Sequence, residues 1–235
     1  MFHAVLTIDD IASKNTPALV DYLTEQGIPA ILFGLGQNIE RNYEEAIYAL
    51  QKGFLIGNHT YSHPGCSGLT LPEVIEEIER CEEVLDRLYR DAGVERIWRP
   101  FRFPYGDQRG DEKEAIQKYL ADHGFHKVKD TQITYPWWRD QGRDRDIDTF
   151  WTYGFREYDI RPGSSYTRED VRRDMDDPNP PGGTPLFQEG VHHLLLLHAH
   201  DETEAMWPGY YRTMLGHLLD RGVVFEKPEF FEAKV

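Results

Sequence analysis

The chain alternates short apolar runs with stretches in which apolar residues recur every three or four positions. Apolar runs of strand length lie at residues 4–8, 29–33, 54–57, 98–103, 125–129, 191–199 and 223–225. Helical spacing is found at residues 16–26, 43–52, 111–123, 168–175 and 213–219. Strands that alternate with helices are typical of a largely parallel sheet, so the pattern predicts an α/β fold.

The most clearly marked helix begins after Thr70. Thr70 and Glu73 have the spacing of a capping box, and Pro72 stands in the first turn, where its missing N–H costs little. The apolar stripe that follows consists of Val74, Ile75, Ile78, Cys81, Val84, Leu85 and Leu88. Acidic residues lie opposite this stripe, so we expect a long amphipathic helix with one face in the core.

The pattern loosens between residues 131 and 185, where aromatics, Arg/Asp pairs, Gly and Pro dominate. A long irregular segment in a compact domain is often a substrate loop or lid. A loop that merely covers the end of a barrel explains the composition equally well. Because no linker or repeat divides the chain, we expect one domain over residues 1–235, with an irregular insertion at about 131–185.

The charge of the chain narrows the classes of partner. With 41 acidic and 26 basic residues, the net charge is −15. Such a field repels a phosphate backbone, so nucleic acid is not an expected partner. No apolar run approaches the roughly 18–20 residues of a membrane span. Met1 is followed almost at once by a strand-like run, so no signal peptide is predicted; this fits either a cytoplasmic protein or a chain whose export segment has been removed.

Polar motifs that could bind a ligand or take part in catalysis follow several predicted strands. Asp9 and Asp10 end the first one, and adjacent carboxylates there point in different directions, although such pairs are more often helix caps. His59 and His63 follow the strand at 54–57. Two histidines four residues apart on a tight turn can present ring nitrogens to one ion, and imidazole with carboxylate suits zinc or a similar divalent metal. On spacing alone, a chance pair of histidines explains the pattern equally well.

Two further motifs have the same placement. Arg102 lies on the strand at 98–103, where an arginine can pair with a carboxylate and hold it ionised. The following Pro-Tyr-Gly turn at Tyr105 can offer a backbone N–H to an oxyanion, or be a plain strand exit. His198 ends the buried strand at 191–199 and could protonate a leaving group. His200 points to the same side, whereas His192 and His193 lie at the start of that strand and are interpreted as structural.

Taken together and in this order, the motifs resemble those of the polysaccharide deacetylase family, the NodB-homology domains of carbohydrate esterase family 4. The resemblance runs from about Ala4 to Phe225. It implies a single distorted, TIM-like (β/α) barrel of about seven strands. In a β/α barrel the carboxyl ends of the strands form the active face, where residues distant in sequence can meet.

The resemblance also implies a role for each motif residue. Asp9 would be the general base, tethered by Arg102, and His198 the general acid. The Tyr105 amide would stabilise the oxyanion. Leu196 would line the acetyl pocket. The metal ligands would be Asp10, His59 and His63. Three protein ligands leave an open position for water and substrate. The implied cofactor is one divalent ion, zinc for preference, with Co²⁺, Ni²⁺ or Mn²⁺ as alternatives.

The chain departs from the family pattern in two places. Ile11-Ala12 follows the Asp pair where the family often has Gly-Pro, which removes no ligand. The family's Asp-Trp motif is best placed at Trp137, where Pro136 stands in the position of the Asp. Trp137 is therefore a candidate wall of the cleft, and Asp130 a candidate support for His198, whose orienting partner stays unassigned. Trp137, Trp138, Tyr135 and Trp151 could stack on sugar rings or equally well pack beneath the long loop.

Three functions remain open on the sequence. The first is metal-assisted removal of an N-acetyl or O-acetyl group from a saccharide. The second is hydrolysis of a small cyclic or linear amide on the same scaffold. The third is carbohydrate binding without catalysis, which the filled catalytic positions argue against.

Overall fold

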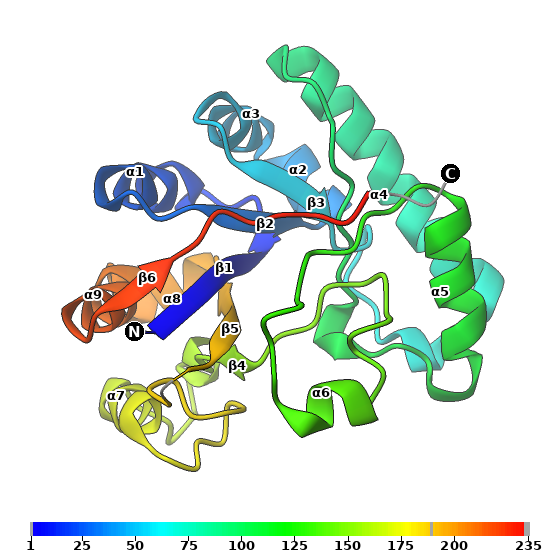
Figure 1. The fold of residues 1–235 in the computed structure, drawn as a ribbon. Coiled ribbons are helices and arrows are strands. Elements are labelled where there is room, and N and C mark those ends of the chain that lie inside the picture. The colour runs from blue at the N-terminus through cyan, green and yellow to red at the C-terminus, as the bar shows by residue number, and fades with distance from the viewer. Residues whose placement is uncertain (1, 189, 233–235) are drawn as a thin grey trace.

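The computed structural model describes residues 2–188 and 190–232. Within this part of the chain, a parallel six-stranded sheet has the order β3–β2–β1–β5–β4, with β6 paired to the start of β1 (Figure 1). The strands are β1 (Phe2–Ile11), β2 (Ala30–Gly34), β3 (Leu55–Asn58), β4 (Tyr153–Gly154), β5 (His192–His198) and β6 (Val223–Phe225). The longest, β1, lies at the centre and pairs with three others.

Helices surround this sheet (Figure 1). They are α1 (Thr16–Gln26), α2 (Gly36–Arg41), α3 (Tyr43–Gln51), α4 (Leu71–Ala92), α5 (Lys113–Asp122), α6 (Pro136–Asp140), α7 (Arg168–Asp176), α8 (Asp201–Met206) and α9 (Tyr210–Asp220). The α4 helix begins as the sequence predicts, because Thr70 and Glu73 form both hydrogen bonds of the capping box. The short helices α2, α6 and α8 were not predicted.

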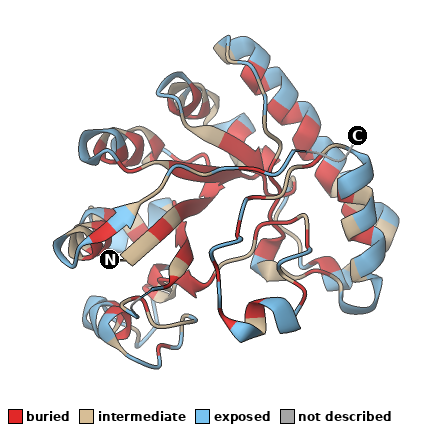
Figure 2. Cartoon of the chain, viewed as in Figure 1, coloured by how far each residue is buried: buried red, intermediate tan, exposed pale blue. Residues whose placement is uncertain are grey.

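Strand alternation separates two apolar layers. Outward residues of β1, β2 and β5, such as Leu6, Leu32 and Leu195, pack against α1, α3, α4 and α9. Inward residues such as Ile31, Phe33 and Leu194 pack with Trp138 of α6 inside the curved sheet. Figure 2 shows the buried positions concentrated on the strands and on the helix faces turned toward them. The inner layer therefore lies inside the curved sheet, next to the carboxyl ends of the strands where the polar motifs stand.

The strands expected at residues 98–103 and 125–129 do not form as regular strands. Each is an extended segment with one isolated bridge, Phe101 to Asn58 and Val128 to Phe230. Backbone hydrogen bonds still attach the first segment to β3, from Asn58 N–H to the Pro100 carbonyl and from Arg102 N–H to the Asn58 carbonyl. The sheet thus curves as in the predicted distorted barrel, but regular strand pairing does not close it.

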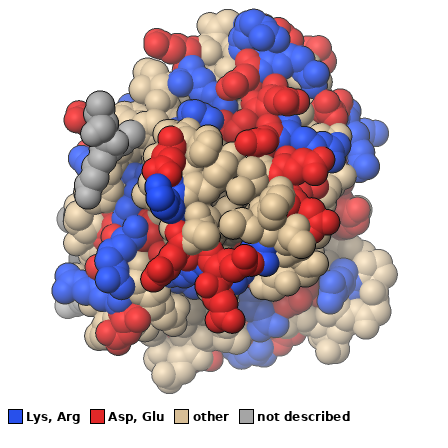
Figure 3. All heavy atoms as spheres, turned by 90° about the vertical axis from the view of Figure 1, so that its right-hand side faces the viewer, with Lys and Arg blue, Asp and Glu red and all other residues tan. Residues whose placement is uncertain are grey.

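Charges on the side of the molecule that carries α4 and α5 are of both signs and intermixed (Figure 3). The buried carboxylate of Glu82 on α4, for example, binds the guanidinium groups of Arg96 and Arg99 at 2.8 and 2.7 Å. In the part of the chain that the structure describes, no helix is both long and apolar enough to cross a membrane.

Candidate active site

A cleft of about 660 Å³ opens at the carboxyl ends of the strands. Asp9 and Asp10 line it from β1, His59 and His63 from the loop after β3, and His198 from the end of β5. The register of the sheet explains this meeting, because Asp9 pairs with His198 and Asn58 pairs with Gly34 of β2. The predicted polar motifs therefore share one cleft.

A bulge at the end of β1 turns Asp10 into the cleft. By alternation Asp9 faces inward, with Thr7, and Asp10 should face outward. Pairing with β2 is irregular between Ile8 and Ile11, and Asp10 has a φ of 66°. Bulges of this kind re-aim side chains, and a left-handed backbone is costly for a residue other than glycine. The outcome is that both neighbouring carboxylates reach the same site.

The loop from His59 to His63 is fixed from beneath by α4. Both Thr60 and His63 have left-handed backbones, with φ of 68° and 65°. Glu77 of α4 accepts hydrogen bonds from the backbone N–H groups of Tyr61 and Ser62 at 3.1 and 2.7 Å. These bonds stabilise a loop conformation that would otherwise be unfavourable. In this conformation the centroids of the His59 and His63 rings lie 5.1 Å apart.

Asp10, His59 and His63 have the geometry of a metal site. Their ligand atoms all lie within 4.8 Å of one another. Asp10 Oδ1 is 3.6 Å from His59 Nε2 and 3.5 Å from His63 Nε2. Two donors about 2.0–2.2 Å from a tetrahedral ion lie roughly 3.3–3.6 Å apart. Among the described residues, the buried Asp10 Oδ1 has no hydrogen-bond partner, which fits an atom that receives a cation.

The protonation of the two imidazoles suits ligation. His59 Nδ1 lies 2.8 Å from the Arg102 carbonyl oxygen. Because a carbonyl only accepts, Nδ1 donates in this contact, and Nε2 is the ring nitrogen that faces Asp10. Burial and the neighbouring His59 lower the pKa of His63 to about 4, so that His63 is neutral at pH 7.

Arg102 holds Asp9 in place. Its side chain is fully buried, and Nη1 donates to Asp9 Oδ1 at 2.8 Å and to Thr7 Oγ1 at 2.7 Å. Nε and Nη2 donate to the carbonyls of Thr149 and Phe150 at 2.9 and 3.2 Å. Asp9 Oδ1 is thus occupied by the guanidinium, whereas Asp9 Oδ2 lies 3.4 Å from His59 Nε2.

Glu157 holds His198. It lies on a short 3₁₀ helix, Glu157–Asp159, and one carboxylate oxygen accepts from both the backbone N–H and Nδ1 of His198, at 2.6 and 2.9 Å. Burial alone would lower the pKa of His198, but the Glu157 carboxylate and the more distant Asp10 and Asp9 raise it to about 9. His198 is therefore protonated at neutral pH, with Nε2 left for the cleft.

His200 is a further histidine of the site. Its Nε2 lies 2.5 Å from Asp10 Oδ2, the oxygen that does not face the other two imidazoles. Burial alone would raise the pKa of Asp10, but this hydrogen bond and the charges of the nearby histidines lower it well below its usual range. The Asp10 carboxylate is thus ionised, with Oδ2 bound and Oδ1 free.

The remaining predicted site residues divide between the cleft and the core. Leu196 and Tyr105 line the cleft, and the Tyr105 ring packs on His63 at 4.6 Å. Trp137 does not line it; it lies on α6 and stacks on Tyr135, with ring centroids 6.3 Å apart. Trp151 lines the cleft in its place. Asp130 does not reach His198, because its carboxylate binds Trp138 and Lys127 instead.

Different parts of the long segment at 131–185 cover the core and line the cleft. Its first part covers the inner core through Trp138, whereas Trp151, Tyr158, Ile160, Arg161 and Pro162 line the cleft. Sequence reasoning missed Glu157 and the contact of His200 with Asp10, and it named Trp151 only among four aromatics that could stack on sugar rings or pack beneath the long loop. Only His200 had a visible signal, its position two residues after His198; Glu157 stands in a segment without periodicity.

Comparison with known proteins identifies relatives of the chain. The profile of the polysaccharide deacetylase family matches residues 2–128. A peptidoglycan-N-acetylglucosamine deacetylase of Bacillus cereus is 36% identical over 134 residues, which are 56% of this chain and 45% of that protein. Chitin deacetylase 3 of Cryptococcus neoformans is 34% identical over 104 residues, 43% of this chain and 24% of that one. The chain thus spans less than half the length of these curated relatives.

A solved structure extends the likeness to the whole fold. The crystal structure of a polysaccharide deacetylase from Bacillus cereus superimposes with a TM-score of 0.65 at 18% identity, covering 97% of this chain and 92% of that one. The range that the family profile matches contains the Asp pair, the two histidines and Arg102. The chain belongs to the polysaccharide deacetylase family.

Proposed function

We propose that the chain is a metal-dependent deacetylase that removes N-acetyl or O-acetyl groups from a poly- or oligosaccharide. One observation carries the proposal: an Asp-His-His triad with ligand spacing lies between an arginine-bound carboxylate and a glutamate-bound histidine in one cleft. Such an arrangement supplies an ion, a base and an acid around one point, which is what hydrolysis of an acyl group requires.

Asp10, His59 and His63 would hold the ion. When bound, a divalent metal polarises the substrate carbonyl as a Lewis acid and lowers the pKa of water to about 7. Two imidazoles and a carboxylate favour zinc, although Co²⁺, Ni²⁺ and Mn²⁺ accept the same donors. His200, bound to the other oxygen of Asp10, orients that carboxylate toward the ion.

The protons would be handled on the two sides of the triad. Asp9, oriented by Arg102, takes a proton from the attacking water through Oδ2. His198, protonated and oriented by Glu157, gives a proton to the departing amine or alcohol. The Tyr105 amide is the proposed donor to the developing oxyanion. Leu196, on the inner face beside the metal triad, is the proposed wall of the acetyl pocket.

The exposed half of the cleft would bind the sugar. Trp151 and Tyr158 come from the segment at 131–185 and add aromatic faces to a cleft that also carries polar side chains. Aromatic faces suit the apolar side of a pyranose ring. We propose an acetylated saccharide as the substrate, as in the peptidoglycan, chitin and xylan deacetylases to which the chain is similar.

The test is acetate release from acetylated glucosamine oligomers, peptidoglycan fragments and acetylxylan, with metal analysis of the same sample. We expect release that chelation abolishes and Zn²⁺ restores. His59→Ala should lose this activity together with the metal bound in the cleft. His123→Ala, which changes an exposed histidine on Tyr119, is the matched control. Full activity after complete chelation would contradict the metal mechanism. Saccharide binding without acetate release would favour a non-catalytic protein, and turnover of small amides alone would favour an amidase.

A further inference from the structure

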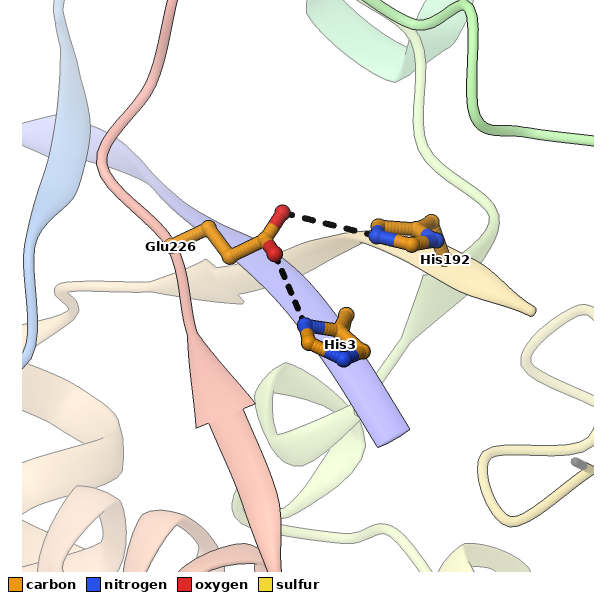
Figure 4. Close-up of side chains that lie close together, drawn as sticks. All are labelled: His3, His192 and Glu226. Carbon is orange, nitrogen blue, oxygen red and sulfur yellow. Dashed lines mark hydrogen bonds and ion pairs between the residues drawn. The ribbon is translucent and has the colours of Figure 1, made fainter. Parts of the chain in front are cut away.

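A second cluster with ligand chemistry lies at the opposite end of the sheet from the cleft. It consists of His3 on β1, His192 on β5 and Glu226 directly after β6 (Figure 4). The Glu226 carboxylate bridges the two rings, with Oε1 2.7 Å from His3 Nδ1 and Oε2 3.5 Å from His192 Nε2. The rings are stacked, with centroids 4.8 Å apart.

Strand register places these side chains on one face. His3 pairs directly with His192, and directly paired residues of parallel strands point to the same side. Val224 of β6 also pairs with His3, and Glu226 follows it by two residues, so Glu226 shares that side. The same inner face reaches the proposed active site six residues further along β1, at Asp9, about 20 Å away at 3.3 Å per residue. The two clusters are therefore at opposite mouths of the barrel.

The cluster has the dimensions and access that a metal ion needs. Its three ligand atoms all lie within 4.8 Å of one another. Two donors of a tetrahedral ion lie roughly 3.3–3.6 Å apart, and the 3.5 Å between His192 Nε2 and Glu226 Oε2 already fits this separation. The 2.7 Å hydrogen bond between His3 Nδ1 and Glu226 Oε1 would have to lengthen by less than about 1 Å. The side chains are 27%, 23% and 35% exposed, so an ion can enter and keep water as its remaining ligand.

The chemistry of the cluster also suits a cation. Without an ion, His3 Nδ1 is hydrogen-bonded to Glu226 Oε1, and His192 Nε2 lies 3.5 Å from Glu226 Oε2. A bound ion would replace these two contacts, with each ring offering one nitrogen as a ligand.

We propose that His3, His192 and Glu226 form a second divalent-metal site, of the zinc type, which joins the first, fifth and sixth strands of the sheet. Two imidazoles and one carboxylate are the same donor set as in the cleft, and they suit zinc, nickel or copper better than magnesium or calcium. The site depends on no acyl-transfer chemistry and stands independently of the proposed function.

The test starts from the full chain with His59→Ala and His63→Ala, which removes the donors in the cleft. Zn²⁺ is titrated in competition with a chromogenic chelator. We expect one equivalent to remain bound, and its affinity to fall at least about tenfold when His192→Gln or Glu226→Gln is added. Glu229→Gln is the matched control, because Glu229 is exposed and its carboxylate binds Lys129 at 2.9 Å.

A second readout avoids dependence on how the added variants fold. In the same double variant, Co²⁺ should shift and broaden the imidazole proton signals of His3 and His192 and leave that of the distant His123 unchanged. If the double variant binds no Zn²⁺, or if binding and the Co²⁺ effect do not involve His3 and His192, the cluster is a hydrogen-bonded clamp and the proposal is wrong.

Discussion

At the scale of single residues, the site assigns different work to two adjacent carboxylates. Asp9 is bound by Arg102, whereas Asp10 is bound by His200 and faces two imidazoles with a free oxygen. The difference arises from the bulge, since regular alternation would have sent Asp10 into the outer core. We propose that Asp10 is a ligand and that Asp9 is not, and this distinction can be tested.

Asp9→Asn should abolish most activity and leave the metal in place. The amide keeps the size of the carboxylate and can still accept from Arg102, but it cannot take a proton from water. We expect kcat to fall by about 10²–10⁴-fold, the usual contribution of a general base. Acetate release and metal content are measured on the same sample. Because Asp9 Oδ2 lies 3.4 Å from His59 Nε2, loss of the metal together with activity would show that Asp9 is itself a ligand.

Glu157→Gln should move the alkaline limb of the pH profile. A general acid works only while protonated, so kcat/KM should decline as pH rises through the His198 pKa of about 9. Glutamine keeps a hydrogen-bond acceptor but removes the charge that raises this pKa, so the limb should shift down by about one to two pH units. The measurement is kcat/KM from pH 6 to 10. A uniform loss with an unmoved limb would argue that Glu157 has no influence on the acid.

At the scale of elements, α4 holds the loop from His59 to His63 in place. Glu77 binds two backbone N–H groups of that loop, and Asn58, which begins it, donates to the Ile78 carbonyl and to Glu82 on the same helix at 3.0 and 2.8 Å. The capping box that fixes the start of α4 thereby contributes to the position of His59 and His63, although it contacts neither.

Glu77→Ala should weaken metal binding without removing a ligand. The loop loses two backbone hydrogen bonds and has left-handed residues at Thr60 and His63, so it will relax away from the ligating geometry. We expect the Zn²⁺ affinity of the cleft to fall by roughly tenfold or more, the usual effect of a partner outside the ligand set. Glu76→Ala, an exposed neighbour on the same helix, is the control. Equal affinities for the two variants would refute this role.

Elements and motifs at strand ends were largely predictable, and contacts made by irregular segments were not. The helix at Thr16–Gln26 and the strand at Val223–Phe225 form with the expected bounds, because their apolar spacing and end signals are local. Segment 98–103 has strand composition, but it forms one isolated bridge to β3, and on its other side it bonds to irregular segments at His126 and Thr149, so regular pairing fails. Glu157 and Trp151 reach the cleft through tertiary packing of the 131–185 segment, which no local pattern encodes.

At the scale of the whole molecule, the cleft collects residues from almost the full length of the chain. Asp10 and His200, 190 positions apart, are in direct contact. Glu157, which binds His198, comes from the segment before α7. A ligand that binds such residues in the native state alone stabilises the whole fold, because the unfolded chain cannot offer them together.

Zinc should therefore raise the unfolding temperature through the cleft. At a free concentration 100 times Kd, one site stabilises by about 2.7 kcal/mol. For a chain of this size, 1 kcal/mol corresponds to roughly 2–4 °C, so the site should contribute roughly 5–11 °C. The contribution is the difference between the Zn²⁺-induced rise of the wild type and that of His59→Ala/His63→Ala, which subtracts any ion bound elsewhere. An equal rise in both proteins would place the stabilising ion outside the cleft and contradict the assignment of Asp10, His59 and His63.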